Sequence, residues 1–217
     1  MRSNTPLLGI VGPPGCGKST LAAAMSEGGA IIIDADGIGH EMLEDSSVRD
    51  NLVAEFGSEM IVSGDMDRSI LSKIVTQDRM SMDRFNRIVH PPLLERIADR
   101  IHGIYRTFPG GVPVVDAALI PEWGIVSFFD LLIYIHCPIH IRMRRLTSAG
   151  KDTAAIERLA SYQSPDHVKR SACHVVVDNI GTRDELVQRG SALIRCICAT
   201  RTREEGEGRC QKRLWTA

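Results

Sequence analysis

A glycine-rich stretch near the amino terminus, GPPGCGKST at residues 12 to 20, holds residue types that bind phosphate. Its spacing is that of the P-loop, Gly12-x-x-x-x-Gly17-Lys18-Ser19, and it lies between an apolar run and the helix-forming segment LAAAM. Backbone N–H groups from Gly15 to Thr20 would converge on a phosphate, where the dipole of the following helix also favours negative charge. The pattern therefore predicts a nucleotide site.

The residues of this loop are expected to have different roles. Lys18 would reach the β- and γ-phosphates, and the Ser19 hydroxyl would ligate Mg²⁺. Pro13 and Pro14 donate no N–H and are expected to stiffen the loop. Cys16 would lie at a helix amino terminus, a setting that lowers the pKa of a thiol, so oxidation sensitivity is a hypothesis here. The residues predicted to bind the nucleotide are Gly12, Pro13, Pro14, Gly15, Cys16, Gly17, Lys18, Ser19 and Thr20.

Carboxylates follow two predicted strands. Asp34 and Asp36 come directly after the apolar run AIII, at the carboxyl end of the sheet where ligands bind in α/β folds. One carboxylate can take a proton from an attacking hydroxyl while another holds a metal or its waters; alternatively, Asp36 only caps a helix. Asp116 follows VPVV and resembles a Walker B carboxylate, or it is buried with a local hydrogen bond.

Cationic groups are candidates for neutralising a transferred phosphoryl group. Four arginines flank a short loop after the fourth predicted strand, and arginines on a mobile lid can act in this way; they are Arg142, Arg144, Arg145 and Arg158. Solvated helix faces would have a similar pattern. His90 precedes two prolines, and it either ends a helix or faces a ligand.

Strands alternating with helices position these residues. Apolar runs predict strands at residues 7–11, 30–33, 112–118, 131–137 and 173–177. Helices are expected at residues 18–25, through much of 38–106, at 139–146, up to about 162, after Pro165 and at 184–198, with breaks at 62–67 and at His90-Pro91-Pro92. This order predicts an α/β fold with a parallel five-stranded sheet and helices on both faces, in the three layers of a P-loop NTPase.

We expect a single domain at residues 1–198, followed by a flexible polar tail at 199–217. A helical insertion at about 38–106 and a lid at about 142–163 belong to that domain. The formal net charge of −1 and the 5% of aromatic residues argue against a general nucleic-acid binder. No apolar stretch reaches the length of about 20 residues that spans a bilayer, and the chain leaves no room for a signal peptide, so we expect no membrane association and a cytoplasmic location.

Taken in order along the chain, these motifs resemble the dephospho-CoA kinase family. The resemblance runs from about Leu8 to Asn179 and rests on GPPGCGKST, IIIDADGIGH, EFGSEMI, GDMDRSILSKIV, the Asn86 to Pro91 segment NRIVHP, the Asp116 to Glu122 segment DAALIPE, and VVVDN. It implies that ATP, with Mg²⁺, donates its γ-phosphate to the ribose 3′-hydroxyl of dephospho-CoA.

The resemblance also assigns roles to residues. Asp36 matches the family's base, and the helical insertion would hold the acceptor dephospho-CoA. The residues expected to bind the substrate are Asp34, Asp36, His40, Arg68, His90 and Leu119. Those expected to act in catalysis are Lys18, Asp36, Arg145 and Arg158, and those expected to bind the metal are Ser19, Asp36 and Asp116. The lid departs from the family pattern, so Arg145, Lys151 and Arg158 are all candidates for its cation. A monomer or weak homo-oligomer is expected.

Two other functions fit parts of the pattern. A P-loop kinase of another nucleoside monophosphate or small metabolite would share the nucleotide site but have a different acceptor pocket. A nucleotide-dependent switch would account for the string Asp34-Ala35-Asp36-Gly37, which reads D-x-x-G, although the sequence has no N-K-x-D guanine motif. A panel of acceptors would separate the two kinases, and a preference for GTP without acceptor-dependent turnover would indicate a switch.

Overall fold

A parallel sheet of five strands forms the centre of the computed structural model, which describes the backbone of residues 5–207 and the side chains of residues 5–199. Its strands run in the order β2-β5-β1-β6-β7. Their bounds are β1 Leu8–Val11, β2 Ala30–Asp34, β5 Val112–Asp116, β6 Leu131–His136 and β7 Val175–Asp178. All four neighbouring pairs are parallel. The predicted α/β fold with its five-stranded parallel sheet is therefore confirmed.

Side chains alternate across the strands and form two cores, one on each face of the sheet. Leu8, Ile10 and Ile133 point into one core, and Leu132 and Tyr134 point into the other. Because both faces are covered, the central strands are apolar along their whole length rather than alternating with polar residues. This burial explains why their sequences are continuous apolar runs.

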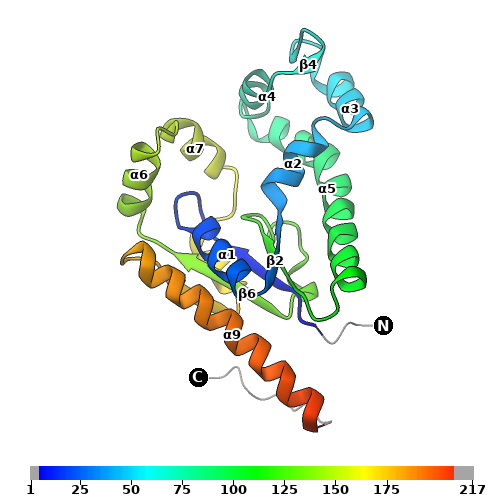
Figure 1. The fold of residues 1–217 in the computed structure, drawn as a ribbon. Coiled ribbons are helices and arrows are strands. Elements are labelled where there is room, and N and C mark those ends of the chain that lie inside the picture. Colours follow the sequence, from blue (N-terminus) through cyan, green and yellow to red (C-terminus); the bar gives the residue numbers. More distant parts are fainter. Residues whose placement is uncertain (1–4, 208–217) are drawn as a thin grey trace.

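One core lies under two helices, α1 (Lys18–Glu27) and α9 (Arg183–Glu207), which pack side by side (Figure 1). The sequence prediction that the last helix ends at Cys198 is wrong, because α9 continues to Glu207. The added residues include alanine, arginine and glutamate, which favour helix. The rest of the expected polar tail, residues 208–217, lies outside the described residues.

The second core lies under an insertion between β2 and β5. It consists of α2 (Ala35–Met42), α3 (Ser46–Phe56), the hairpin of β3 (Ile61–Val62) and β4 (Asp65–Met66), α4 (Arg68–Val75) and α5 (Arg79–Thr107). Aspartates cap each of its helices by accepting hydrogen bonds from first-turn N–H groups; these are Asp34, Asp45, Asp67 and Asp78. The break predicted at 62–67 is the hairpin.

The break predicted at His90-Pro91-Pro92 is wrong, because α5 passes through both prolines. A proline donates no N–H and so removes an intrahelical hydrogen bond. Here the buried residues Val89, Leu93 and Ile97 lie in one core, on both sides of the proline pair. Tertiary packing therefore keeps the helix continuous where local sequence predicts an end.

The predicted lid consists of α6 (Ile139–Ser148) and α7 (Thr153–Ala160) and is followed by α8 (Asp166–Ser171); a short 3-10 helix, η1 (Val126–Phe128), precedes β6. In Figure 1, α6 and α7 lie on one side of the sheet's carboxyl edge, and the insertion rises on the other. The glycine-rich loop lies at this edge, between β1 and α1. None of the helices in the described part of the chain is long and apolar enough to cross a membrane.

The contact between α1 and α9 depends on Gly190. A Cβ atom at this position would lie 3.0 Å from the Cβ of Ala24 and 3.2 Å from the Leu21 carbonyl oxygen. We predict that Gly190→Val forces the helices apart and lowers the free energy of unfolding by about 1–3 kcal/mol, as measured by urea denaturation. Gly103→Ala is the control, since a Cβ in that part of α5 meets nothing within 4 Å. It should stabilise by about 0.5–1 kcal/mol, and equal effects of the two changes would refute the packing argument.

Candidate active site

The glycine-rich loop is held in a conformation that requires glycine at two positions. Gly15 and Gly17 have φ values of 76° and 104°, in the left-handed region that other residues rarely adopt. A Cβ on Gly15 would lie 3.0 Å from the Arg142 carbonyl oxygen on α6, and one on Gly17 would lie 2.5 Å from Nδ2 of Asn179. The loop is therefore packed closely between the lid and the segment after β7.

The amino terminus of α1 presents its N–H groups without a side-chain cap in the described structure, because Gly17 occupies the N-cap position. The first turn also carries no acidic residue, so the positive end of the helix dipole is left for an anion. The Lys18 ammonium donates to the Gly12 carbonyl oxygen at 3.1 Å and so lies back over the loop. Ser19 is exposed in the same turn.

Cys16 does not behave as its position in the sequence predicts. Its side chain is fully buried in the core beneath the loop, and this burial raises the pKa of the thiol to about 11. The Lys18 charge and a backbone hydrogen bond lower the pKa, but by less than burial raises it. The expected lowering of the thiol pKa is therefore wrong, and Cys16 packs as a small apolar residue.

Three carboxylates gather beside this loop at the carboxyl ends of β2 and β5. Asp34 and Asp116 are direct neighbours in the sheet, and Asp36 follows in the first turn of α2. The helix cap proposed for Asp36 belongs instead to Asp34, whose Oδ1 accepts a hydrogen bond from the Asp36 N–H at 3.1 Å. The carboxylate of Asp36 is exposed, so it is available for chemistry.

Asp116 is the least exposed carboxylate of the cluster, and it is half-buried. Burial raises the pKa of its carboxyl group from 3.8 to about 6; Lys18 opposes this shift, and the charges of Asp36 and Asp34 add to it. Its Oδ1 atom is buried and has no hydrogen-bond partner among the described residues. An unpaired buried oxygen is costly, and a bound metal or its water would satisfy it.

The chemistry of these donors fits Mg²⁺ bound through few protein ligands. Within the described residues, no group of three or more histidine, cysteine, aspartate or glutamate side chains is arranged to hold a metal. Mg²⁺ commonly keeps several waters and binds through one or two protein oxygens together with phosphates. The Ser19 hydroxyl and the unpaired Asp116 oxygen are such donors.

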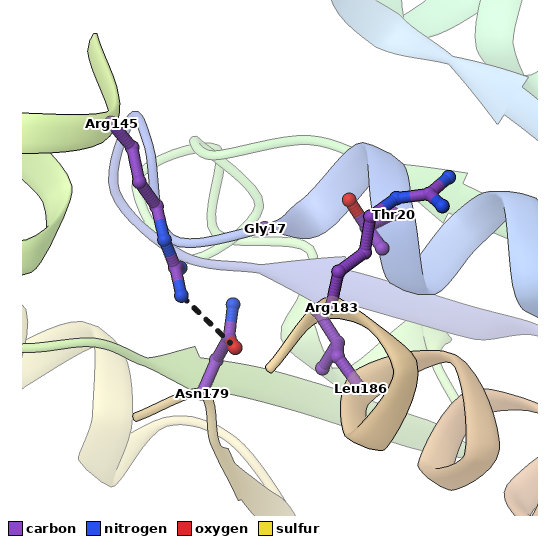
Figure 2. Close-up of a pocket in the computed structure, with 6 residues that line it drawn as sticks. All are labelled: Gly17, Thr20, Arg145, Asn179, Arg183 and Leu186. Atoms are coloured by element: carbon purple, nitrogen blue, oxygen red, sulfur yellow. Dashed lines mark hydrogen bonds between the residues drawn. The ribbon is translucent and has the colours of Figure 1, made fainter. Parts of the chain in front are cut away.

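Among the candidates for the lid cation, Arg145 on α6 lines a cavity together with Gly17 of the loop. Its Nη2 donates to Oδ1 of Asn179 at 3.4 Å (Figure 2). Nδ2 of Asn179 in turn donates to the Cys16 carbonyl oxygen at 2.7 Å. The cavity has a volume of about 250 Å³; its lining residues are Gly17, Thr20, Arg145, Asn179, Arg183 and Leu186. The Arg158 guanidinium is exposed and makes no hydrogen bond or ion pair with the described residues. Lys151 is also exposed.

Asn179 and Arg183 were not among the predicted site residues. For Asn179 the sequence signal is the polar pair Asp178-Asn179 at the end of the apolar run VVV, the end of a strand at which the site carboxylates also occur. Arg142, also a candidate, pairs with Asp166 at 3.2 Å and donates to the Cys137 carbonyl oxygen, so it joins α6 to α8.

The residues predicted to bind the acceptor are spread along the insertion and the loop after β5. The His90 ring on α5 meets Trp123 edge-on, with 5.9 Å between ring centroids, and burial lowers the pKa of His90. Leu119 is half-buried in the loop, and His40 is exposed on α2. Arg68, at the start of α4, pairs with Glu44 at 3.3 Å. Their binding role stays a prediction.

Comparisons with known proteins support one family. A family model described as dephospho-CoA kinase matches residues 6–185. A dephospho-CoA kinase from Thermobifida fusca is 31% identical over 182 residues, covering 82% of this chain and 90% of the relative. One from Frankia casuarinae is 32% identical over 197 residues, covering 89% and 84%. A crystal structure from Thermus thermophilus matches with a TM-score of 0.72 at 23% identity, over 88% of this chain and 97% of that one, which supports the fold.

The raised pKa of Asp116 makes stability depend on pH. Between about pH 4 and 6 the folded protein keeps a proton that the unfolded chain releases, so the free energy of unfolding falls as the pH rises through this window. We predict that Asp116→Asn removes this contribution: the variant should match the wild type near pH 4 and exceed its stability by about 1–3 kcal/mol at pH 7. Urea denaturation across the pH range measures it. A constant difference between the two proteins would show that Asp116 does not titrate as described.

Proposed function

The chain belongs to the dephospho-CoA kinase family, and from this premise we propose that it transfers the γ-phosphate of ATP to the ribose 3′-hydroxyl of dephospho-CoA. The observation that supports this reaction best is the meeting of the uncapped α1 terminus with Lys18, exposed Asp36 and half-buried Asp116 at one edge of the sheet. A phosphate site thus lies beside a base, and the insertion that would carry the acceptor begins at the same edge.

On the donor side, the N–H groups at the start of α1 would bind the β-phosphate. Lys18 would exchange its hydrogen bond with the Gly12 carbonyl oxygen for the β- and γ-phosphate oxygens. The cavity beside Gly17 and Asn179 opens next to the loop, and we assign the adenine base to it. Arg145 at its edge would lie against the phosphates and stabilise the charge that develops during transfer.

On the acceptor side, Asp36 would orient the 3′-hydroxyl and take its proton as the oxygen attacks phosphorus. The exposed Asp36 carboxylate is free to act as a base, because Asp34 and not Asp36 caps α2. Ser19 and Asp116 would hold Mg²⁺, which supplies a positive charge to the phosphates when it is bound. His40, Arg68, His90 and Leu119 would contact the acceptor. A monomeric or weakly associated state stays a prediction, as does a cytoplasmic location.

The test is ADP release from the purified protein with Mg-ATP, with and without dephospho-CoA. Adenosine, AMP and shikimate serve as alternative acceptors, and mass spectrometry of the product identifies the added phosphate. Strong stimulation by dephospho-CoA alone supports the proposal. Stimulation by another acceptor would favour a P-loop kinase of a different metabolite, and ATP binding without any stimulation would indicate a non-catalytic member of the family.

Two substitutions separate phosphate binding from base chemistry. We predict that Lys18→Ala abolishes turnover, because the β/γ-phosphates lose their cation, and that Asp36→Asn lowers kcat by about 100-fold or more, because the general base is lost. ATP affinity, measured by isothermal titration calorimetry, should stay close to the wild-type value in Asp36→Asn. A near-normal turnover rate in that variant would refute the role of Asp36.

The lid arginines should differ in their effects. We predict that Arg145→Ala raises the KM for ATP and lowers kcat by about 10- to 100-fold, since Arg145 lies at the loop and the cavity. Arg158→Ala, which removes an exposed guanidinium of α7, should change both constants less. Steady-state kinetics of the two variants compare them. A larger effect of Arg158→Ala would assign the catalytic cation to α7 instead.

A further inference from the structure

A buried ammonium outside the proposed phosphate site joins separate parts of the chain. Lys169 on α8 is 1% exposed, and its Nζ donates to the Ala118 carbonyl oxygen at 3.0 Å and to Oε1 of Gln163 at 2.7 Å. The same Nζ forms an ion pair with Oε1 of Glu122 at 3.0 Å, so two neutral acceptors and one carboxylate surround the ammonium. A lysine is rarely buried unless it is paired in this way.

The groups that contact the Lys169 ammonium belong to two segments on either side of the proposed active site. Ala118 and Glu122 belong to residues 117–124, which we call the post-β5 loop because it directly follows Asp116. Gln163 belongs to residues 161–165, the lid return, where the chain leaves α7. Glu122 strengthens the link, because its Oε1 also accepts a hydrogen bond from the Ser164 N–H at 3.0 Å.

The other side of Glu122 faces the insertion. Its Oε2 atom is buried and has no hydrogen-bond partner in the described structure, and its charge is close enough to raise the pKa of His90 against the lowering effect of burial. The neighbouring Trp123 packs its ring against His90. One carboxylate thus connects the lid return with the wall of the insertion.

The insertion is also joined to the lid return directly. The Tyr162 hydroxyl donates to the Thr76 carbonyl oxygen, just beyond α4, at 2.9 Å. The lid return is therefore anchored to two neighbours, the post-β5 loop and the insertion. By contrast, residues 150–152 at the tip between α6 and α7 are exposed, which is expected of the part of a lid that moves.

We propose that the Lys169–Glu122 ion pair is a positioning device that couples the acceptor side of the site to the lid. Lys169 is too deeply buried to touch a substrate, so it acts by fixing the lid return to the loop that carries Leu119 and follows Asp116. An acceptor that displaces the post-β5 loop or His90 moves the lid return with it. A buried ion pair adds little net stability over an apolar replacement. The hydrogen bonds of Lys169 to Ala118 and Gln163 are directional, so they define one position of the lid return relative to the post-β5 loop.

This inference rests on the proposed function and predicts reciprocal coupling between the two substrates. In the wild type, the β,γ-imido analogue of ATP should tighten dephospho-CoA binding by about fivefold or more, a typical size for such coupling. Gln163→Met cuts the direct bond between the ammonium and the lid return but leaves the Lys169–Glu122 pair and the Glu122–Ser164 bond in place. We expect the coupling factor to fall toward 1 and kcat to fall about tenfold, with the KM for ATP changed less than about twofold.

The matched control is Gln188→Met, the same chemical change at an exposed position of α9. It should leave the coupling factor and kcat at wild-type values. A second variant, Lys169→Met/Glu122→Gln, removes both buried charges while residue 122 can still accept from the Ser164 N–H. It should also lose the coupling, although its thermal unfolding temperature stays within a few degrees of the wild type.

Calorimetry of dephospho-CoA binding, with and without the ATP analogue, decides the outcome together with steady-state kinetics. Wild-type coupling and kcat in folded Gln163→Met would overturn the inference and leave the proposed function intact. A wild-type coupling factor of 1 would overturn it as well. Absence of dephospho-CoA-dependent turnover in the wild type would contradict the proposed function and, with it, this inference. If the double variant does not fold, Gln163→Met alone gives the answer.

Discussion

Backbone N–H groups at the start of α1 have no side-chain cap among the described residues, because glycine occupies the N-cap position and the first turn has no carboxylate. These donors and the helix dipole create an anion site from the main chain alone. The site exists only while Gly15 and Gly17 hold left-handed conformations against α6 and Asn179. The lid, the segment after β7 and the phosphate site are therefore built around the same few glycines.

Two ionisable side chains with little exposure, Asp116 and Lys169, differ in whether the protein supplies partners for them. Asp116 keeps an unpaired oxygen at the edge of the sheet, and burial raises its pKa, so the free protein is less stable at neutral pH than a neutral side chain would make it. Such a cost is common where a charge is kept for a ligand. Lys169 is the opposite case, since its ammonium has two hydrogen-bond acceptors and a carboxylate around it within the protein.

Different elements surround the two faces of the sheet and its carboxyl edge. The helices α1 and α9 cover one core and pack closely enough to exclude a side chain at Gly190. The lid and the insertion extend from the opposite edges of the catalytic end, and both meet the post-β5 loop through polar or aromatic contacts. Contacts from both elements thus converge on the loop that follows Asp116.

The amino-acid sequence by itself determined the alternation of strands and helices, the phosphate loop and the carboxylates at the strand ends, because these depend on local spacing and on apolar runs. Only the tertiary structure decided which aspartate caps α2, that the Cys16 thiol is buried, and that α5 continues through two prolines. It also brought Asn179 to Arg145 and Lys169 to Ala118, pairs separated by 34 and 51 positions. Contacts of this kind arise from the folded packing of distant segments, which no local pattern encodes.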